Sequence, residues 1–235
     1  VMQRAKALEN RVVELIATIG EIVVNGGGDD IGPRANLQGE FSSVWKARTD
    51  PVFEYFCEKC ILSLLVDIAK EVGQGKNNLP KRSSLGSSSS SLHGVVWSGP
   101  VKAQVYRTVS LLISDVRNQS ILYYLLSNNY INLLIKGMLP LQQWTEPAIA
   151  KMLPVYVELL KNLTLQIADD PNLFQFLTLE NLDDDEDNTI SAASIEFPLF
   201  SAVLETATSN YAQSDSHIYA SCLAIIVNLM HIPHL

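Results

Sequence analysis

This sequence has few cysteines and few basic residues. The three cysteines, Cys57, Cys60 and Cys222, are too few for a disulfide framework and lie within apolar patterns, which predicts a reducing, cytoplasmic compartment. Seventeen Lys and Arg face 25 Asp and Glu, for a net charge of −8. With so little basic character and no basic cluster larger than a dipeptide, we expect no nucleic-acid partner.

The sequence also has no apolar run long enough to cross a bilayer. The longest, around Tyr219 to Met230, is shorter than the ~20 residues that a spanning helix needs. No stretch looks like a signal peptide. We therefore expect a soluble protein that associates with membranes only peripherally, if it does so at all.

Recognisable catalytic and metal-binding patterns are scarce. Cys57 and Cys60 have the C-x-x-C spacing of a redox pair or of half a zinc site, but no second ligand pair accompanies them, and an apolar helical pattern carries both thiols. His231 and His234 likewise lack further ligands. No serine, cysteine or carboxylate has a recognisable base. The sequence therefore predicts a protein that is not an enzyme and holds no cofactor and no metal.

An internal repeat is present instead. EYFCEKCILSLLVD at 54–67 aligns with YYLLSNNYINLLIK at 123–136, at an offset of 69 positions. The alignment pairs Tyr55 with Tyr124 and Phe56 with Leu125, and it pairs the Leu-rich run 64–66 with 133–135. A short aromatic helix, a polar break and a Leu-rich helix, used twice, indicate stacked helical repeats.

Long apolar segments at helical spacing surround these copies, at 8–24, 101–116, 149–167 and 218–230. In the third, Leu153, Val157, Leu160 and Leu163 share one face. The fourth is apolar nearly all round, as expected of an inner-layer helix. The pattern predicts an all-α fold, an armadillo/HEAT-like α-solenoid of irregular helical repeats. Because 1–235 ends directly after an apolar helix, we interpret it as a single helical-repeat domain within a longer protein.

Three stretches interrupt the helical pattern. Residues 25–50 predict a loop, and 73–99 predict a disordered Gly/Ser-rich insertion, since that composition buries too little apolar area to offset its ordering entropy. The acidic run at 183–187 predicts a solvated loop over 180–194.

Four segments together resemble the FPL-domain family of endosomal and autophagy regulators. The helix at 11–24 resembles the family's opening helix. VFEYFCEKCILSLLVDI at 52–68 is similar to its V-F-D-F-F-x-E-K segment, and 122–132 is close to its L-Y-Y-L-L-S-N-N-Y-V-N signature. Phe197, Pro198 and Leu199 stand where its Phe-Pro-Leu lies. In the segments 52–68 and 122–132, the matched positions are Phe53, Tyr55, Phe56, Glu58, Lys59, Tyr123, Tyr124, Leu125, Leu126, Ser127, Asn128, Asn129 and Tyr130.

The last helix departs from the family pattern. Tyr219 and Leu223 occupy its two basic positions, whereas Asn228 is kept. Any anionic contact of those basic residues is therefore not expected here.

The resemblance implies a non-catalytic scaffold in endosome–lysosome traffic, autophagy and mitophagy. Implied partners are proteins of the trafficking and autophagy machinery, with a ubiquitin ligase in the animal members. The implied location is cytoplasmic, at endosomal, lysosomal or Golgi membranes. Two alternatives stay open: a structural repeat domain whose larger protein has its activity elsewhere, and a peripheral membrane binder, which the missing basic amphipathic face weakens.

The signature residues themselves have two interpretations. Tyr124, Leu125 and Ile131 fall on repeated apolar positions and are expected in the core. Ser127, Asn128 and Asn129 are expected to form the break, capping a helix end and tolerating left-handed backbone. Alternatively, the break is a partner-binding site.

Overall fold

The computed structural model describes residues 2–25, 51–70, 97–115, 119–181 and 194–232. Within these ranges the chain is all-helical apart from one pair of short strands. The predicted loop at 25–50 lies outside the described residues except for Asn25, which ends a helix. The predicted insertion at 73–99 lies outside them except for its last three residues, and Gly99 begins a helix.

The elements follow the predicted order of long helices and short helix pairs. They are α1 (Met2–Asn25), α2 (Pro51–Glu58), α3 (Ile61–Lys70), α4 (Gly99–Asp115), α5 (Gln119–Ser127), α6 (Tyr130–Gly137), η1 (Leu141–Gln143), α7 (Glu146–Asp169), η2 (Pro171–Leu177), β1 (Leu179–Asn181), β2 (Ser194–Glu196), α8 (Pro198–Thr208), α9 (Asn210–Ser214) and α10 (Ser216–Met230).

Two short strands stand at the ends of the predicted loop at 180–194, whose residues 182–193 lie outside the described residues. β1 pairs antiparallel with β2, with Leu179 opposite Glu196 and Asn181 opposite Ser194. Both ends of the acidic stretch are therefore held by backbone pairing, which satisfies their amide and carbonyl groups. The acidic run at 183–187 lies outside the described residues.

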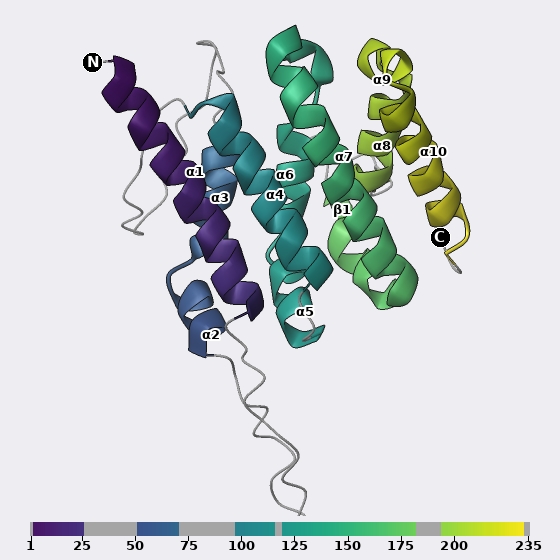
Figure 1. Cartoon of the computed structure of the whole chain (residues 1–235). Helices are drawn as coiled ribbons and strands as arrows, with labels where there is room; N and C mark the ends of the chain where they lie inside the picture. Colours follow the sequence, from purple (N-terminus) through teal and green to yellow (C-terminus); the bar gives the residue numbers. More distant parts are fainter. Residues whose placement is uncertain (1, 26–50, 71–96, 116–118, 182–193, 233–235) are drawn as a thin grey trace, which may run out of the picture.

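The helices form two layers (Figure 1). α1, α4, α7 and α10 lie side by side, each in contact with the next, and α3, α6 and α8 pack in the same sequential order behind them. Each layer covers the apolar face of the other, which is the usual way for helices to bury their apolar stripes.

A glycine allows α1 and α4 to approach closely. A Cβ atom on Gly20 would lie 2.9 Å from Cγ2 of Thr108. The Thr108 hydroxyl donates a hydrogen bond to the carbonyl of Ile16 at 3.1 Å. A side chain at position 20 would therefore require a shift of the Thr108 side chain or of one of the two helices.

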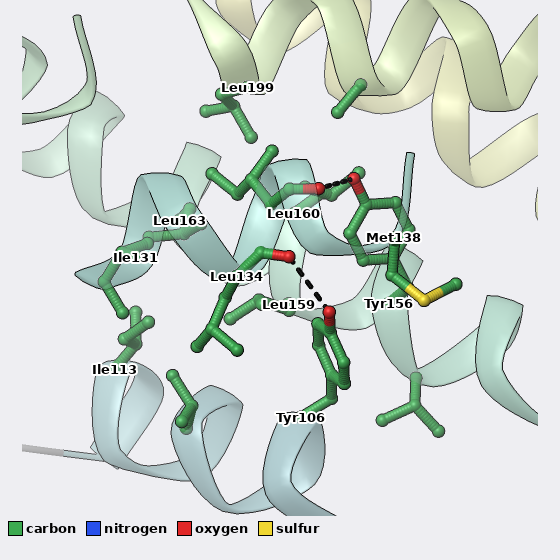
Figure 2. Close-up of a cluster of buried hydrophobic side chains, with 14 of the residues drawn as sticks. Tyr106, Ile113, Ile131, Leu134, Met138, Tyr156, Leu159, Leu160, Leu163 and Leu199 are labelled. Carbon is green, nitrogen blue, oxygen red and sulfur yellow. Dashed lines mark hydrogen bonds between the residues drawn. The ribbon is translucent and has the colours of Figure 1, made fainter. Parts of the chain in front are cut away.

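Two buried tyrosines donate hydrogen bonds to carbonyls of α6 inside the core (Figure 2). The Tyr106 hydroxyl of α4 donates to the Leu134 carbonyl at 2.9 Å, and the Tyr156 hydroxyl of α7 donates to the Ile135 carbonyl at 2.8 Å. These carbonyls belong to the last turn of α6, where helical carbonyls lack intrahelical partners. Their rings meet edge to face, with centroids 5.9 Å apart. Burial raises the pKa of both phenols, so both remain neutral donors.

The central and last long helices differ in burial. The predicted face of α7, made by Leu153, Val157, Leu160 and Leu163, is buried, and so are several residues beside it. The prediction for α10 was wrong. It buries only one face and exposes Tyr219, Leu223, Val227 and Met230, because within the described structure it has neighbours on one side only.

Candidate functional site

The two predicted repeats share an unusual backbone turn. Cys60, between α2 and α3, has φ 49°, and Asn129, between α5 and α6, has φ 59°. Both are left-handed non-glycine residues, and they lie 69 positions apart (129 − 60), which is the offset of the sequence repeat. The repeat in sequence is therefore also a repeat of backbone conformation.

The two motifs meet through aromatic side chains. The Phe53 ring lies 5.5 Å from the Tyr124 ring at 88°, and it stacks on Phe56 at 6.1 Å. The Tyr124 hydroxyl and the Cys57 thiol are hydrogen-bonded. Burial, followed by this hydrogen bond, raises the pKa of Tyr124 to about 12. Burial also raises the pKa of Cys57, so the thiol is a poor nucleophile at neutral pH.

Other residues of the first motif face outward. Tyr55 is 58% exposed, and the Lys59 ammonium lies 5.3 Å from its ring centroid. Lys59 also forms an ion pair with Glu58 at 2.8 Å. This exposed trio contributes little to the core.

Ser127 and Asn128 close the end of α5. The Ser127 hydroxyl and the Asn128 amide both donate to the Tyr124 carbonyl, at 3.1 and 3.2 Å. Asn129 supplies the left-handed turn, and its side chain makes no capping hydrogen bond to α6. Leu125, Leu126 and Ile131 are buried, whereas Tyr124 and Tyr130 are half-buried.

Sequence reasoning missed Asn132, which is 1% exposed. Its amide donates to Oδ1 of Asn129 at 2.8 Å and to the Phe176 carbonyl at 2.9 Å. Its own Oδ1 has no hydrogen-bond partner in the described structure. A buried asparagine in an apolar helix pattern is the signal that could have identified it, because burying an amide is costly unless it is hydrogen-bonded.

Tyr123 ties the second repeat to η2. Its hydroxyl donates to Oδ2 of Asp170 at 2.8 Å, and Gln119 donates to the same oxygen at 2.7 Å. Its ring lies edge to face on Phe176, with centroids 5.6 Å apart. The hydrogen bond from Tyr123 is the main reason why the pKa of Asp170 is lowered, and it raises the pKa of Tyr123.

The Phe-Pro-Leu motif starts α8. Phe197 is the N-cap residue and packs on Phe174 of η2 at 4.7 Å, Pro198 occupies the first turn, and Leu199 is fully buried. Proline suits this position because the first-turn amides have no intrahelical partner. The motif is thus placed to begin a helix. Asn228 lies apart from these aromatic pairs, exposed on α10.

The apolar pattern predicted that one helix carries both cysteines of the C-x-x-C pair, and this prediction was wrong. α2 ends at Glu58, Cys57 is half-buried and Cys60 is exposed in the left-handed turn. His231 caps α10, and His234 lies outside the described residues. Among the described side chains, no three His, Cys, Asp or Glu gather as a metal-ligand group.

A groove lies between α1, α4 and α7, and most of the residues that line it are of polar type. It has a volume of about 280 Å³. Arg107 lies in it with carboxylates of α1 and α7, and the Asn162 amide donates to the Ser110 hydroxyl at 2.8 Å. The lining is Ala17, Glu21, Gln104, Arg107, Thr108, Ser110, Leu111, Ser114, Glu158 and Asn162. Sequence reasoning missed this groove because its residues come from three helices far apart in the chain.

The described residues form a mainly helical fold of two layers, in which two helix pairs repeat a left-handed turn. Its signature residues lie mainly in contacts between elements. The family model of FPL, described as an uncharacterised conserved protein, matches residues 86–230, and the chain belongs to this family. The match contains the second signature and the Phe-Pro-Leu motif, whereas the segment with Phe53 lies outside it.

The chain is also similar to the Protein CLEC16A homolog of Caenorhabditis elegans. The two are 25% identical over 133 residues, which make up 57% of this chain and 12% of the relative. The chain thus spans about an eighth of that relative's length. No solved structure matches it. In the described part of the chain, no helix combines the length and the apolar character needed to cross a membrane.

Proposed function

We propose that this chain is a non-catalytic scaffold of the α-solenoid type that binds other proteins. The observation that carries the proposal is the groove across α1, α4 and α7. It is lined by hydroxyls, amides and charges of both signs, and it crosses three successive helices of one layer. Stacked helices present extended surfaces of this kind to segments of other proteins.

Arg107 and Glu158 are the groove residues best placed to contact a partner. Both side chains are exposed, and neither has an ion-pair partner among the described residues. Their opposite charges fit a protein segment that carries charges of both signs. They can be changed without disturbing the core beneath them.

The proposed setting is endosome–lysosome traffic and the regulation of autophagy and mitophagy. Membership of the FPL family and the similarity to the CLEC16A homolog support it. The proposed partners are proteins of that machinery, including a ubiquitin ligase. We place the chain in the cytoplasm, peripheral to endosomal, lysosomal or Golgi membranes.

One observation favours a second function, a structural repeat domain of a larger protein whose activity lies elsewhere. α10 exposes a stripe of four large apolar side chains, and the whole helix carries no Asp, Glu, Lys or Arg. Such a face suits burial under another element of the same protein. On this alternative, the groove binds nothing.

Rescue of depleted source cells separates the two functions. The whole protein carrying Arg107→Glu and Glu158→Lys is compared with wild type and with Lys161→Glu, a control on the exposed surface of α7. Lysosomal delivery of endocytosed cargo, autophagic flux and proximity labelling are measured together. The scaffold function predicts that the groove variant is folded and abundant but loses rescue and specific labelled neighbours. Full rescue by that variant would favour the structural domain.

A further inference from the structure

The turn between α2 and α3 brings two cysteines together. Cys57 lies in the last turn of α2, and Cys60 lies in the left-handed turn that leads into α3. The amide of Cys60 donates a hydrogen bond to the carbonyl of Cys57 at 2.9 Å. A turn closed in this way holds its first and fourth Cα atoms less than about 7 Å apart. Disulfides span Cα separations of about 4.4–6.8 Å, so the spacing of this pair is compatible with one.

The two thiols differ in their surroundings. Cys60 is exposed, whereas Cys57 is half-buried and hydrogen-bonded to the Tyr124 hydroxyl. Burial is the main cause of the raised pKa of Cys57, and the nearby Cys60 thiol adds to the rise. Cys60 is therefore the thiol that a dissolved oxidant reaches first, and Cys57 lies close enough to react with it next.

The second unit shows that the turn itself requires neither thiol. At the offset of 69 positions, Leu126 takes the place of Cys57 (126 − 57) and is buried. Asn129 takes the place of Cys60 (129 − 60) and has the same left-handed conformation. Asparagine tolerates this conformation, whereas for cysteine it is costly. Packing and backbone geometry therefore do not account for two cysteines in the first unit.

We infer that Cys57 and Cys60 are a reversible oxidation site, which forms an intramolecular disulfide with glutathione disulfide as the oxidant. The Cys60 thiolate attacks one sulfur of glutathione disulfide, which forms a mixed disulfide and releases one glutathione thiolate. The Cys57 thiol then loses its proton to solvent, and its sulfur attacks the Cys60 sulfur and releases the second glutathione thiolate. The two thiolates take up two protons. The protein is oxidised by two electrons, and one glutathione disulfide is reduced to two glutathiones.

The site lies where the two repeats meet. Tyr124 of α5 is hydrogen-bonded to the Cys57 thiol, and its ring packs on Phe53 of α2. Oxidation converts that thiol into a disulfide sulfur and joins the end of α2 covalently to the start of α3. In a reducing compartment the dithiol is the resting form. The contact between the repeats therefore contains a group that responds to the glutathione poise.

This inference goes beyond the proposed function and does not require the groove to bind a partner. The groove is lined by residues of α1, α4 and α7, and none of them belongs to α2, α3 or α5. Loss of disulfide formation and loss of the groove partner are therefore separate outcomes.

Oxidation of the 235-residue chain in glutathione buffers of increasing oxidised fraction tests the site. Free thiols are blocked with N-ethylmaleimide, and tryptic peptides are identified by mass spectrometry without reduction. Trypsin cuts between Lys59 and Cys60, so the disulfide appears as the peptides 49–59 and 60–70 joined to each other. We expect this joined pair to accumulate in the wild type. Cys222, which is buried, is the internal control and should stay free.

Two variants separate the steps. Cys57→Ser keeps the exposed thiol but removes its neighbour, so a glutathione adduct at Cys60 should persist at least about tenfold longer than in the wild type. Cys60→Asn introduces the residue that the second unit has in its turn. Cys57 alone should then react at least about tenfold more slowly than Cys60 does in Cys57→Ser, because it is the less accessible thiol. Circular dichroism verifies that each variant is folded.

Three results would overturn the inference. One is a glutathione adduct at Cys60 that persists in the wild type as long as in Cys57→Ser, which would show that Cys57 does not reach it. The second is a disulfide that joins two chains, seen as a doubled mass without reduction. The third is a wild-type chain whose thiols all stay free in every buffer.

Discussion

The α2–α3 and α5–α6 units have the same turn but different surroundings. Phe56 and Leu125 are both buried, and so are Leu65 and Leu134, at matching positions of the two units. Tyr124 packs on Phe53 of the preceding unit, whereas its counterpart Tyr55 is exposed. Position within a unit thus sets which residues face the core. The neighbours of each unit decide whether an outward aromatic residue is covered.

The largest expected effects fall on the shared core. Leu65→Ala and Leu134→Ala should each lower the free energy of unfolding by about 2–5 kcal/mol, because each leaves a cavity in a fully buried site. Chemical denaturation measures both. Similar losses would extend the equivalence of the units from structure to energetics. A loss below about 1 kcal/mol for Leu65→Ala alone would show that the two units are not energetically equivalent.

The matching tyrosines Tyr124 and Tyr55 should differ in how much they contribute to stability. Tyr124→Ala is expected to cost about 2 kcal/mol, less than a full aromatic cavity because the ring is half-buried. Tyr55→Ala is the matched control and should stay within about 0.5 kcal/mol, as at other exposed sites. Thermal unfolding compares them. Equal effects would contradict the stacking of one unit on the next.

The left-handed turns should respond differently to glycine. Cys60→Gly is expected to raise the unfolding free energy by about 1 kcal/mol, since a left-handed conformation is costly for cysteine and not for glycine. Asn129→Gly should change the unfolding free energy little. Asparagine tolerates the left-handed conformation, so glycine relieves little strain, and the variant also loses the hydrogen bond that Oδ1 of Asn129 accepts from Asn132. Cys60→Ala removes the thiol without relieving the backbone and should show no gain.

The smallest effect is a difference in pH dependence. The lowered pKa of Asp170 means that its ionised form is favoured in the folded protein. Its stabilisation is therefore complete above the unfolded pKa, about 4, and is lost as pH falls through the folded value. The melting temperature of Tyr123→Phe should accordingly fall less steeply with acid than that of wild type.

Local patterns allowed much of the fold to be predicted. Apolar spacing located the long helices, and the 69-residue offset located the two turns. The apolar spacing could not show which face of a helix would be covered by neighbouring helices. α10 has the composition of an inner helix, yet Leu223 and Met230 are exposed, because coverage depends on neighbours and not on the helix itself. The pairing of β1 with β2 also depends on a contact across the acidic stretch.

The candidate site was predicted only where it coincides with sequence motifs. Phe53 and Tyr124 were both singled out, but their contact joins segments about 70 positions apart and follows from the stacking. The groove around Arg107 contains no motif, since each helix contributes ordinary polar residues at surface spacing. Asn132 shows the same difficulty, because its partner Phe176 lies in η2.

The hydroxyls of Tyr106 and Tyr156 have a consequence for the cooperativity of unfolding. Two carbonyls in the last turn of α6 accept hydrogen bonds from side chains, one from α4 and one from α7. Neither long helix alone can satisfy both carbonyls. Detaching either long helix leaves a carbonyl of α6 without its partner in an apolar surrounding. α4, α6 and α7 are therefore coupled, and we expect these three helices to unfold together as one cooperative unit.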